Sequence, residues 1–189
     1  MPVGSRFILH RAMQVPLVMT VIGKDRPGLV NLVSRLVAEH GGNWLESRMC
    51  QLGGEFAGIL RVCVPADRQA ALEKALADLP AQGLAVVVRA DPGEPALQLK
   101  MRAVLEVVGQ DRPGIVHQIS QTLAFHSVNV EELHSECQSA PMSGETHFRA
   151  EATLQIPEGC ELSQLRSELE KIAGDLMVDL NLQPLPEPH

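Results

Sequence analysis

The feature that most constrains the fold of this chain is a stretch that occurs twice. The first copy reads Val-Ile-Gly-Lys-Asp-Arg-Pro-Gly-Leu-Val at 21–30, and the second reads Val-Val-Gly-Gln-Asp-Arg-Pro-Gly-Ile-Val at 107–116. A repeat of 86 residues is longer than a solenoid unit and is the size of a small domain. The 189-residue chain is therefore predicted to contain two duplicated domains. The same offset continues past the motif at three further pairs: His40 and His126, Asn43 and Asn129, and Glu46 and Glu132.

Each copy of the motif has the pattern of a strand that turns into a helix. An apolar run ends at a Gly, which permits a sharp turn, and helical periodicity begins after the Asp, Pro and Gly that follow. Asp can accept hydrogen bonds from the free N–H groups of a first helical turn, and Pro fits that turn because it has no N–H to lose. Exposed N–H groups and the positive end of the helix dipole would suit a carboxylate or a phosphate.

Hydrophobic periodicity predicts the same order of elements in both halves. Each half reads β-α-β-β-α-β, the ferredoxin-like pattern, with both helices on one face of a four-stranded antiparallel sheet. The predicted fold class is therefore α+β, and each sheet leaves a face and an edge strand to be covered. Strands are expected at 16–22, 43–52, 55–64, 84–89, 97–108, 128–137, 146–156 and 177–182, and helices at 28–40, 67–79, 114–125 and 162–173.

Pro and Gly clusters set the expected domain boundaries. Residues 1–14 are an N-terminal extension, 15–90 the first domain, 91–96 a linker, 97–183 the second domain and 184–189 a Pro-rich tail. The extension has only a three-residue apolar run, which is too short for a signal peptide. Whether residues 1–12 belong to the native protein is left open.

Composition excludes several classes of function. The net charge of −7 without a basic block argues against direct nucleic-acid binding, because phosphate neutralisation supplies most of that affinity. It does not argue against binding a DNA-binding protein. No apolar run reaches transmembrane length, so no membrane partner is expected. The four cysteines form no C-x-x-C pair and no zinc-finger spacing with His, which predicts a reducing, cytoplasmic location without a metal.

The sequence shows no catalytic signature. It has no G-x-S-x-G, no P-loop and no H-E-x-x-H, so an enzyme is not predicted and no cofactor is expected. Fold alone does not exclude catalysis. His134 and His147 would face each other across a hairpin, but no third ligand lies at a suitable spacing, so no metal site is predicted.

The β-α-β-β-α-β order resembles the ACT domain, a small amino-acid-sensing module. The resemblance rests on Asp-Arg-Pro-Gly at the first strand–helix junction and on an Asn fifteen residues after that Gly. It covers residues 15–90 and 97–182. Two ACT domains with little else, together with a loop at 139–144 followed by His147-Phe148, look like the glycine cleavage system transcriptional repressor family.

This resemblance implies a ligand, a site and a partner. ACT domains bind a small amino acid where the first strand–helix loop meets a neighbouring ACT domain, so glycine or serine is the expected ligand. The implied partner is a DNA-binding activator of glycine cleavage genes, which the protein would repress. The alternative is a stand-alone regulatory subunit of an amino-acid metabolic enzyme, and self-association is also left open. The implied ligand-binding residues are Asp25, Arg26, Gly28, Leu29, Asn43, Asp111, Arg112, Gly114, Ile115 and Asn129.

Structural interpretations of the same residues stand beside the functional ones. The motif is also the pattern of an ordinary capped helix start, and duplication would copy a structural turn as readily as a site. Arg26 and Arg112 would either clamp a carboxylate or be solvated. Asn43 and Asn129 would either touch a ligand or satisfy their own turns. Trp44 is expected to pack within its domain or at a domain interface.

Overall fold

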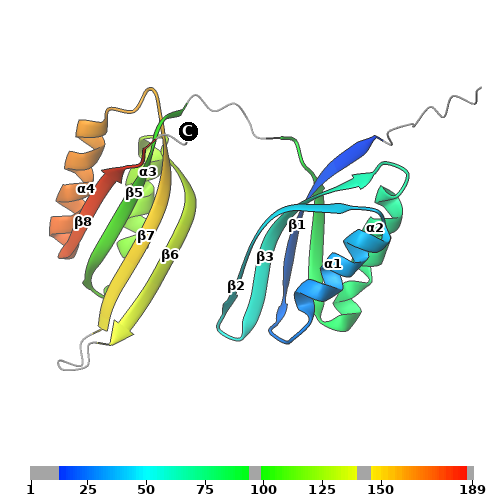
Figure 1. Cartoon of the computed structure of the whole chain (residues 1–189). Helices are drawn as coiled ribbons and strands as arrows, with labels where there is room; N and C mark the ends of the chain where they lie inside the picture. The colour runs from blue at the N-terminus through cyan, green and yellow to red at the C-terminus, as the bar shows by residue number, and fades with distance from the viewer. Residues whose placement is uncertain (1–12, 94–98, 140–145, 187–189) are drawn as a thin grey trace, which may run out of the picture. The chain divides into compact units, whose positions relative to one another are not determined.

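The computed structural model describes residues 13–93, 99–139 and 146–186. The chain divides into two compact units, residues 1–95 and 96–189. Each unit has the order β-α-β-β-α-β, with both helices packed on one face of a four-stranded antiparallel sheet (Figure 1). The predicted fold class and the duplication are therefore confirmed. The predicted extension, linker, second hairpin loop and tail lie wholly or partly outside the described residues.

The first unit contains β1 (Gln14–Lys24), α1 (Leu29–Glu39), β2 (Asn43–Leu52), β3 (Glu55–Pro65), α2 (Gln69–Ala77), the 3-10 helix η1 (Leu79–Gln82) and β4 (Leu84–Ala90). Its sheet has the order β2-β3-β1-β4, so the first strand lies in the middle and β2 at an edge.

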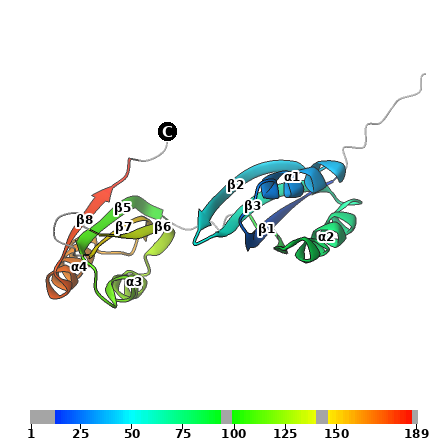
Figure 2. The same ribbon diagram turned by 90° about the horizontal axis from the view of Figure 1, so that it is seen from below.

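The second unit contains β5 (Leu99–Gln110), α3 (Ile115–Phe125), β6 (Asn129–Ser139), β7 (Thr146–Pro157), α4 (Leu162–Leu176) and β8 (Val178–Pro184). The sheet order β6-β7-β5-β8 matches that of the first unit. Seen along the sheet, α3 and α4 lie side by side beneath the strands of this unit (Figure 2).

Alternation along the central strands builds each core on the helix-covered face. In the first unit, α1 contributes one buried side chain per turn, as its periodicity predicts: Leu29, Val33 and Val37. These residues pack against alternate residues of the sheet, which are at most 1 % exposed: Leu17, Met19, Val21, Leu60, Val62 and Val64.

The second helix of the first unit is shorter than predicted. It begins at Gln69 and ends at Ala77, and the chain then forms the separate 3-10 turn η1. Pro80 lies near the start of that turn, where the absence of an N–H costs nothing. Pro80 therefore begins a new turn, while Gly83, at φ 79°, ends it as expected.

The glycine that precedes each Asp-Arg-Pro-Gly motif does not make the predicted turn. Gly23 and Gly109 lie within β1 and β5 and have no positive φ. A Cβ on Gly23 would lie 2.3 Å from the carbonyl oxygen of Gly83, and one on Gly109 would lie 2.7 Å from Cγ1 of Val178. Glycine is needed here because the neighbouring strand approaches too closely for a side chain.

Candidate functional site

In the first unit, the Asp-Arg-Pro-Gly loop is tied to two other segments. The backbone N–H of Asp25 donates to the carbonyl of Gly54 in the β2–β3 hairpin, at 2.9 Å. The guanidinium of Arg26 donates to the carbonyl of Gln82, just before β4, also at 2.9 Å. Arg26 is thus neither simply solvated nor free, because one arm of its guanidinium anchors the loop. The side chains of Asp25 and Arg26 are nonetheless exposed.

In the second unit, different atoms make the two corresponding contacts of the Asp-Arg-Pro-Gly loop. The N–H of Asp111 donates to the carbonyl of Thr146 at the start of β7, at 2.9 Å. The guanidinium of Arg112 lies 3.1 Å from Oε1 of Gln110 and 3.7 Å from Sδ of Met177, just before β8. The loop is therefore held between the same two elements in both units.

The helix start differs from the predicted capped turn. The N-cap residues are Gly28 and Gly114, with φ of 94° and 95°, and neither α1 nor α3 has a side-chain capping bond. Asp25 and Asp111 lie three residues before the caps, and Pro27 lies outside the helix. The predicted capping role of Asp is therefore wrong. Only glycine adopts this left-handed conformation without strain, which explains its presence at the cap.

The absence of a side-chain cap leaves donors open at the start of α1. The first helical bond there runs from Leu32 N–H to Gly28 carbonyl, so the N–H groups of residues 29–31 precede the helical ladder. There is no acidic side chain in the first turn. A Cβ built on Gly28 would meet nothing within 4 Å. The arrangement suits a small ligand with a carboxylate.

Leu29 and Ile115 contribute to this region through the backbone alone. Each residue is 2 % exposed, and its side chain belongs to the core of its unit. A ligand at the loop would therefore reach their N–H groups and not their side chains.

The predicted asparagines lie at the opposite end of each sheet from the loop. Asn43 pairs with Cys63, which pairs with Pro16, and Lys24 at the end of β1 is eight residues further along. At about 3.3 Å per residue, these ends are about 26 Å apart. Within one unit, Asn43 and the loop thus do not hold the same small ligand. The same register places Asn129 far from the second loop.

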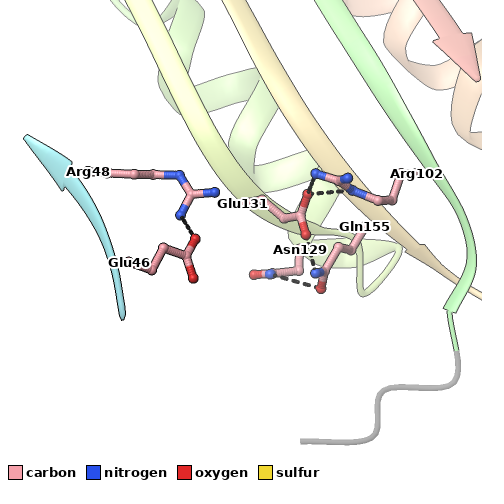
Figure 3. Close-up of polar contacts among 6 residues, drawn as sticks. All are labelled: Glu46, Arg48, Arg102, Asn129, Glu131 and Gln155. Atoms are coloured by element: carbon pink, nitrogen blue, oxygen red, sulfur yellow. Dashed lines mark hydrogen bonds and ion pairs between the residues drawn. The ribbon is translucent and has the colours of Figure 1, made fainter. Parts of the chain in front are cut away.

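Asn129 instead belongs to a polar chain at the start of β6 (Figure 3). Its amide donates to Oε1 of Gln155 at 3.4 Å, and the amide of Gln155 donates to Glu131. Glu131 also accepts from Nε of Arg102, at 2.8 Å. This pattern supports the structural interpretation, in which Asn129 satisfies groups of its own unit. The two units differ here, because the positions matching Glu131, Arg102 and Gln155 are Leu45, Pro16 and Cys63.

Cys137 lies beside the second loop, a position that no sequence pattern indicates. Desolvation raises the pKa of the Cys137 thiol, and so do the nearby charge of the Asp111 carboxylate and a hydrogen bond to it. Cys137 pairs with Phe148, which pairs with Gly109. Only this strand register brings the cysteine to the motif, since the two residues are far apart in the sequence.

The strand register and the burial of side chains test two further predictions, one on the histidine pair and one on Trp44. His134 pairs with Glu151 and His147 pairs with Gln138, so the two histidines do not face each other. Among residues 13–93, 99–139 and 146–186, no group of three or more metal-ligating side chains is arranged to hold an ion. Trp44 is half-buried and packs against the core of the first unit.

No helix within the described part of the chain is long and apolar enough to cross a membrane.

Comparisons with known proteins agree with this architecture. The model of the ACT domain matches residues 15–89. The glycine cleavage system transcriptional repressor of Escherichia coli (strain K12) is 28% identical over 171 residues, which cover 88% of this chain and 86% of that protein. UPF0237 protein MK1213 of Methanopyrus kandleri is 36% identical over 83 residues, covering 43% of this chain and 86% of that protein.

A solved structure extends the similarity to both units. The crystal structure of an unknown protein from Galdieria sulphuraria superposes with a TM-score of 0.79 at 29% identity. The match covers 92% of this chain and 100% of the other.

Proposed function

Because residues 15–89 match the model of the ACT domain and the second unit has the same order of strands and helices, we propose that this protein is a regulator that senses a small amino acid and passes the signal to a partner protein. The similarity to the glycine cleavage system transcriptional repressor of E. coli supports a regulatory role. The proposed ligand is glycine or serine, and the proposed partner is a DNA-binding regulator of glycine cleavage genes. The protein is proposed to act without catalysing a reaction.

The observation that carries the ligand proposal is the uncapped helix start beside an exposed Asp and Arg. The ligand carboxylate would accept hydrogen bonds from the first-turn N–H groups that follow Gly28, in the field of the helix dipole. The carboxylate of Asp25 would pair with the ligand ammonium, and Arg26 would hold the loop in place through Gln82. Open space at Gly28 favours a ligand that approaches the backbone closely.

The second loop is proposed to bind in the same way through Asp111, Arg112, Gly114 and the N–H of Ile115. Its Asp111 carboxylate is already in contact with Cys137, and Arg112 is half-buried. We therefore expect the second loop to bind more weakly than the first. Asn43 and Asn129 lie too far from the loop of their own unit to contact a ligand there. Each would contact only a ligand bound at the loop of a different unit.

Action through a partner follows from charge. The net charge of −7 opposes binding to the DNA backbone, which supports control of a promoter through a second, DNA-binding protein. A regulatory subunit of an amino-acid enzyme would use the same ligand site, but the similarity to a transcriptional repressor favours the first role.

Affinity purification from the native host, with and without added glycine, tests the partner. The expected result is co-purification of one DNA-binding regulator, identified by mass spectrometry, in an amount that changes with glycine. An Asp25→Asn variant should lose the response to glycine while still binding the regulator. Recovery of an amino-acid-metabolising enzyme in place of a DNA-binding protein would overturn the transcriptional role. Chemical conversion of the added glycine would overturn the non-enzymatic one.

A further inference from the structure

Each sheet has one face that the helices of its unit do not cover, and in the first unit this open face is apolar (Figure 1). Ile22 of β1, Ile59 of β3 and Val87 of β4 are 51%, 49% and 54% exposed. They lie together, because Thr20 pairs with both Ile59 and Val87, and Ile22 is two residues further along β1. Contiguous apolar exposure of this kind is typical of an interaction surface.

The second unit does not carry this surface, although its sheet has the same strand order and register. Glu151 stands at the position of Ile59, and Asn181 at that of Val87. Other charged side chains on the same face are Glu106, Arg149 and Asp179. Since one duplicated fold carries either kind of face, the fold itself does not require apolar side chains on the open face of the first sheet.

Charged side chains border the apolar surface at both ends. Lys24 of β1 pairs with Glu55 of β3 at the end near the Asp-Arg-Pro-Gly loop. At the other end, Glu46 of β2, Arg61 of β3 and Arg89 of β4 lie in one row across the sheet. The border therefore carries both signs of charge, so a surface of the same composition can complement it.

The apolar surface is complementary to a second copy of itself. A two-fold axis parallel to the strands keeps each row in register and reverses the strand order, so β3 lies over β1 and β2 over β4 of the second copy. Ile59 then faces Thr20 of the second copy, and Ile22 faces Ala57. Each large side chain thus meets a small one, which lets the two layers interdigitate.

The same axis brings opposite charges together. Glu55 of one copy faces Lys24 of the second copy, and Glu46 faces Arg89. Because the axis repeats every contact, each pair occurs twice. Glu46 also accepts a hydrogen bond from Arg48 of its own unit at 2.7 Å, so the contact of Glu55 with Lys24 gives the more direct test. Such border pairs fix the orientation of a complex more than its affinity.

The size of the face indicates a weak contact. Residues 18–24 across four strands give a footprint of about 450 Å² on each copy. Standard interfaces bury about 800 Å² on each partner. The open face of the second unit is a poorer occupant, because it would bury Glu106 and Glu151 against Ile59 without a compensating charge.

We propose that the open face of the first sheet, centred on Ile22, Ile59 and Val87, binds the same face of a second copy of this chain. The two sheets pack face to face about the two-fold axis parallel to their strands, in a dimer that forms as the protein concentration rises. This self-association does not depend on the proposed amino-acid ligand, so either can fail without the other.

Sedimentation equilibrium of the full chain at up to about 200 μM tests the contact, because an interface below the standard size binds weakly. Ile59→Glu should weaken self-association at least about tenfold by burying a charge, and the second sheet already holds Glu151 at this position. Val108→Glu is the matched control, since Val108 is 41% exposed on the open face of the second unit, and it should change nothing. A monomeric wild type, or equal self-association of Ile59→Glu and the wild type, would overturn the proposal.

Charge reversal in two different chains tests the orientation. In Lys24→Glu and in Glu55→Lys, like charges face each other across the axis, so each variant should self-associate more weakly than the wild type. A mixture of the two variants restores opposite charges at both contacts. The mixed dimer should therefore form at least about threefold more tightly than either variant alone. A mixed dimer no tighter than the two separate ones would overturn the proposed arrangement.

Cys50 reports on the open face directly. It is exposed and lies on that face, because it pairs with Ala57, which pairs with Ile22. Its alkylation by iodoacetamide, followed by peptide mass spectrometry, should slow as the wild-type concentration rises and should not slow in Ile59→Glu. Cys137, which is exposed in the second unit, is the internal control and should react at a constant rate. A Cys50 rate independent of protein concentration would also overturn the proposal.

Discussion

The substitution Gly109→Ala separates the structural part of the repeated motif from its proposed ligand-binding part. Gly109 lies two residues before Asp111 and pairs directly with Val178 of β8. A Cβ there would lie 2.7 Å from Cγ1 and 2.8 Å from Cα of Val178, and 2.9 Å from the carbonyl oxygen of Met177. Normal contacts between carbon atoms are about 3.5–4.0 Å, so β8 would have to move.

Overpacking of this kind costs about 1–3 kcal/mol of unfolding free energy. For a unit of this size, the midpoint of thermal unfolding should fall by at least about 4 °C. Gly174→Ala is the matched control in the same unit, because Gly174 lies in α4 and a Cβ there would meet nothing within 4 Å. Alanine in a helix is favoured over glycine by about 0.5–1 kcal/mol, so this variant should be slightly more stable than the wild type.

Hydrogen exchange read locally over β5 and β8 is the assay of choice, because the single tryptophan, Trp44, lies in the first unit. As the denaturant concentration rises, amide hydrogens of the second sheet should exchange faster in Gly109→Ala than in the wild type. They should exchange more slowly in Gly174→Ala. Equal stability of Gly109→Ala and the wild type would refute the argument that close strand approach selects this glycine.

Two further predictions concern the second unit. Ser127 has a φ of 56°, and the matching residue of the first unit is Gly41, at 70°. Ser127→Gly should therefore relieve backbone strain and raise the unfolding free energy by about 1 kcal/mol. Urea denaturation measures this, and an unchanged midpoint would contradict it. A hydrogen bond from His126 is the main reason that the pKa of Glu168 lies below its ordinary 4.5, so its contribution to stability is present above that pH and is lost as the pH falls through the lowered pKa. The variant Glu168→Gln should consequently lose less stability than the wild type between pH 6 and pH 3, and parallel pH profiles would show that the pair contributes nothing.

The repeat and the hydrophobic periodicity were sufficient to predict the fold. Helix α1 illustrates this, because Leu29, Val33 and Val37 are spaced to face one side and are all buried. The hairpin at Gly53-Gly54 was equally predictable, since both residues have positive φ, at 61° and 84°. Such signals are local, so they appear directly in the sequence.

The details that the sequence did not predict depend on contacts between distant segments. The sequence pattern indicates a turn at Gly23, because the close approach of Gly83 becomes visible only once β4 is placed beside β1. The sequence pattern favours Asp25 as a helix cap, whereas α1 begins only after a turn at Pro27 and Gly28, so Asp25 lies three residues before the cap.

The candidate site was predictable in part for the same reason. Asp25, Arg26 and Gly28 are adjacent in the chain and necessarily form one loop. The resemblance groups Asn43 with them, yet the direction of β2 places it at the far end of the sheet. Likewise, the contact of Cys137 with Asp111 follows only from the register of β6.

The central claim is that the uncapped start of α1 binds a small amino acid, and calorimetric titration with glycine and serine tests it most directly. Saturable binding of one of them to the wild type is the expected result. Asp25→Asn should weaken that binding at least tenfold, because a charge-assisted bond to the ligand ammonium is lost. The corresponding Asp111→Asn should have a smaller effect, while Ile59→Glu, away from both loops, should have none. Absence of binding, or equal affinity of the Asp25→Asn variant and the wild type, would contradict the account.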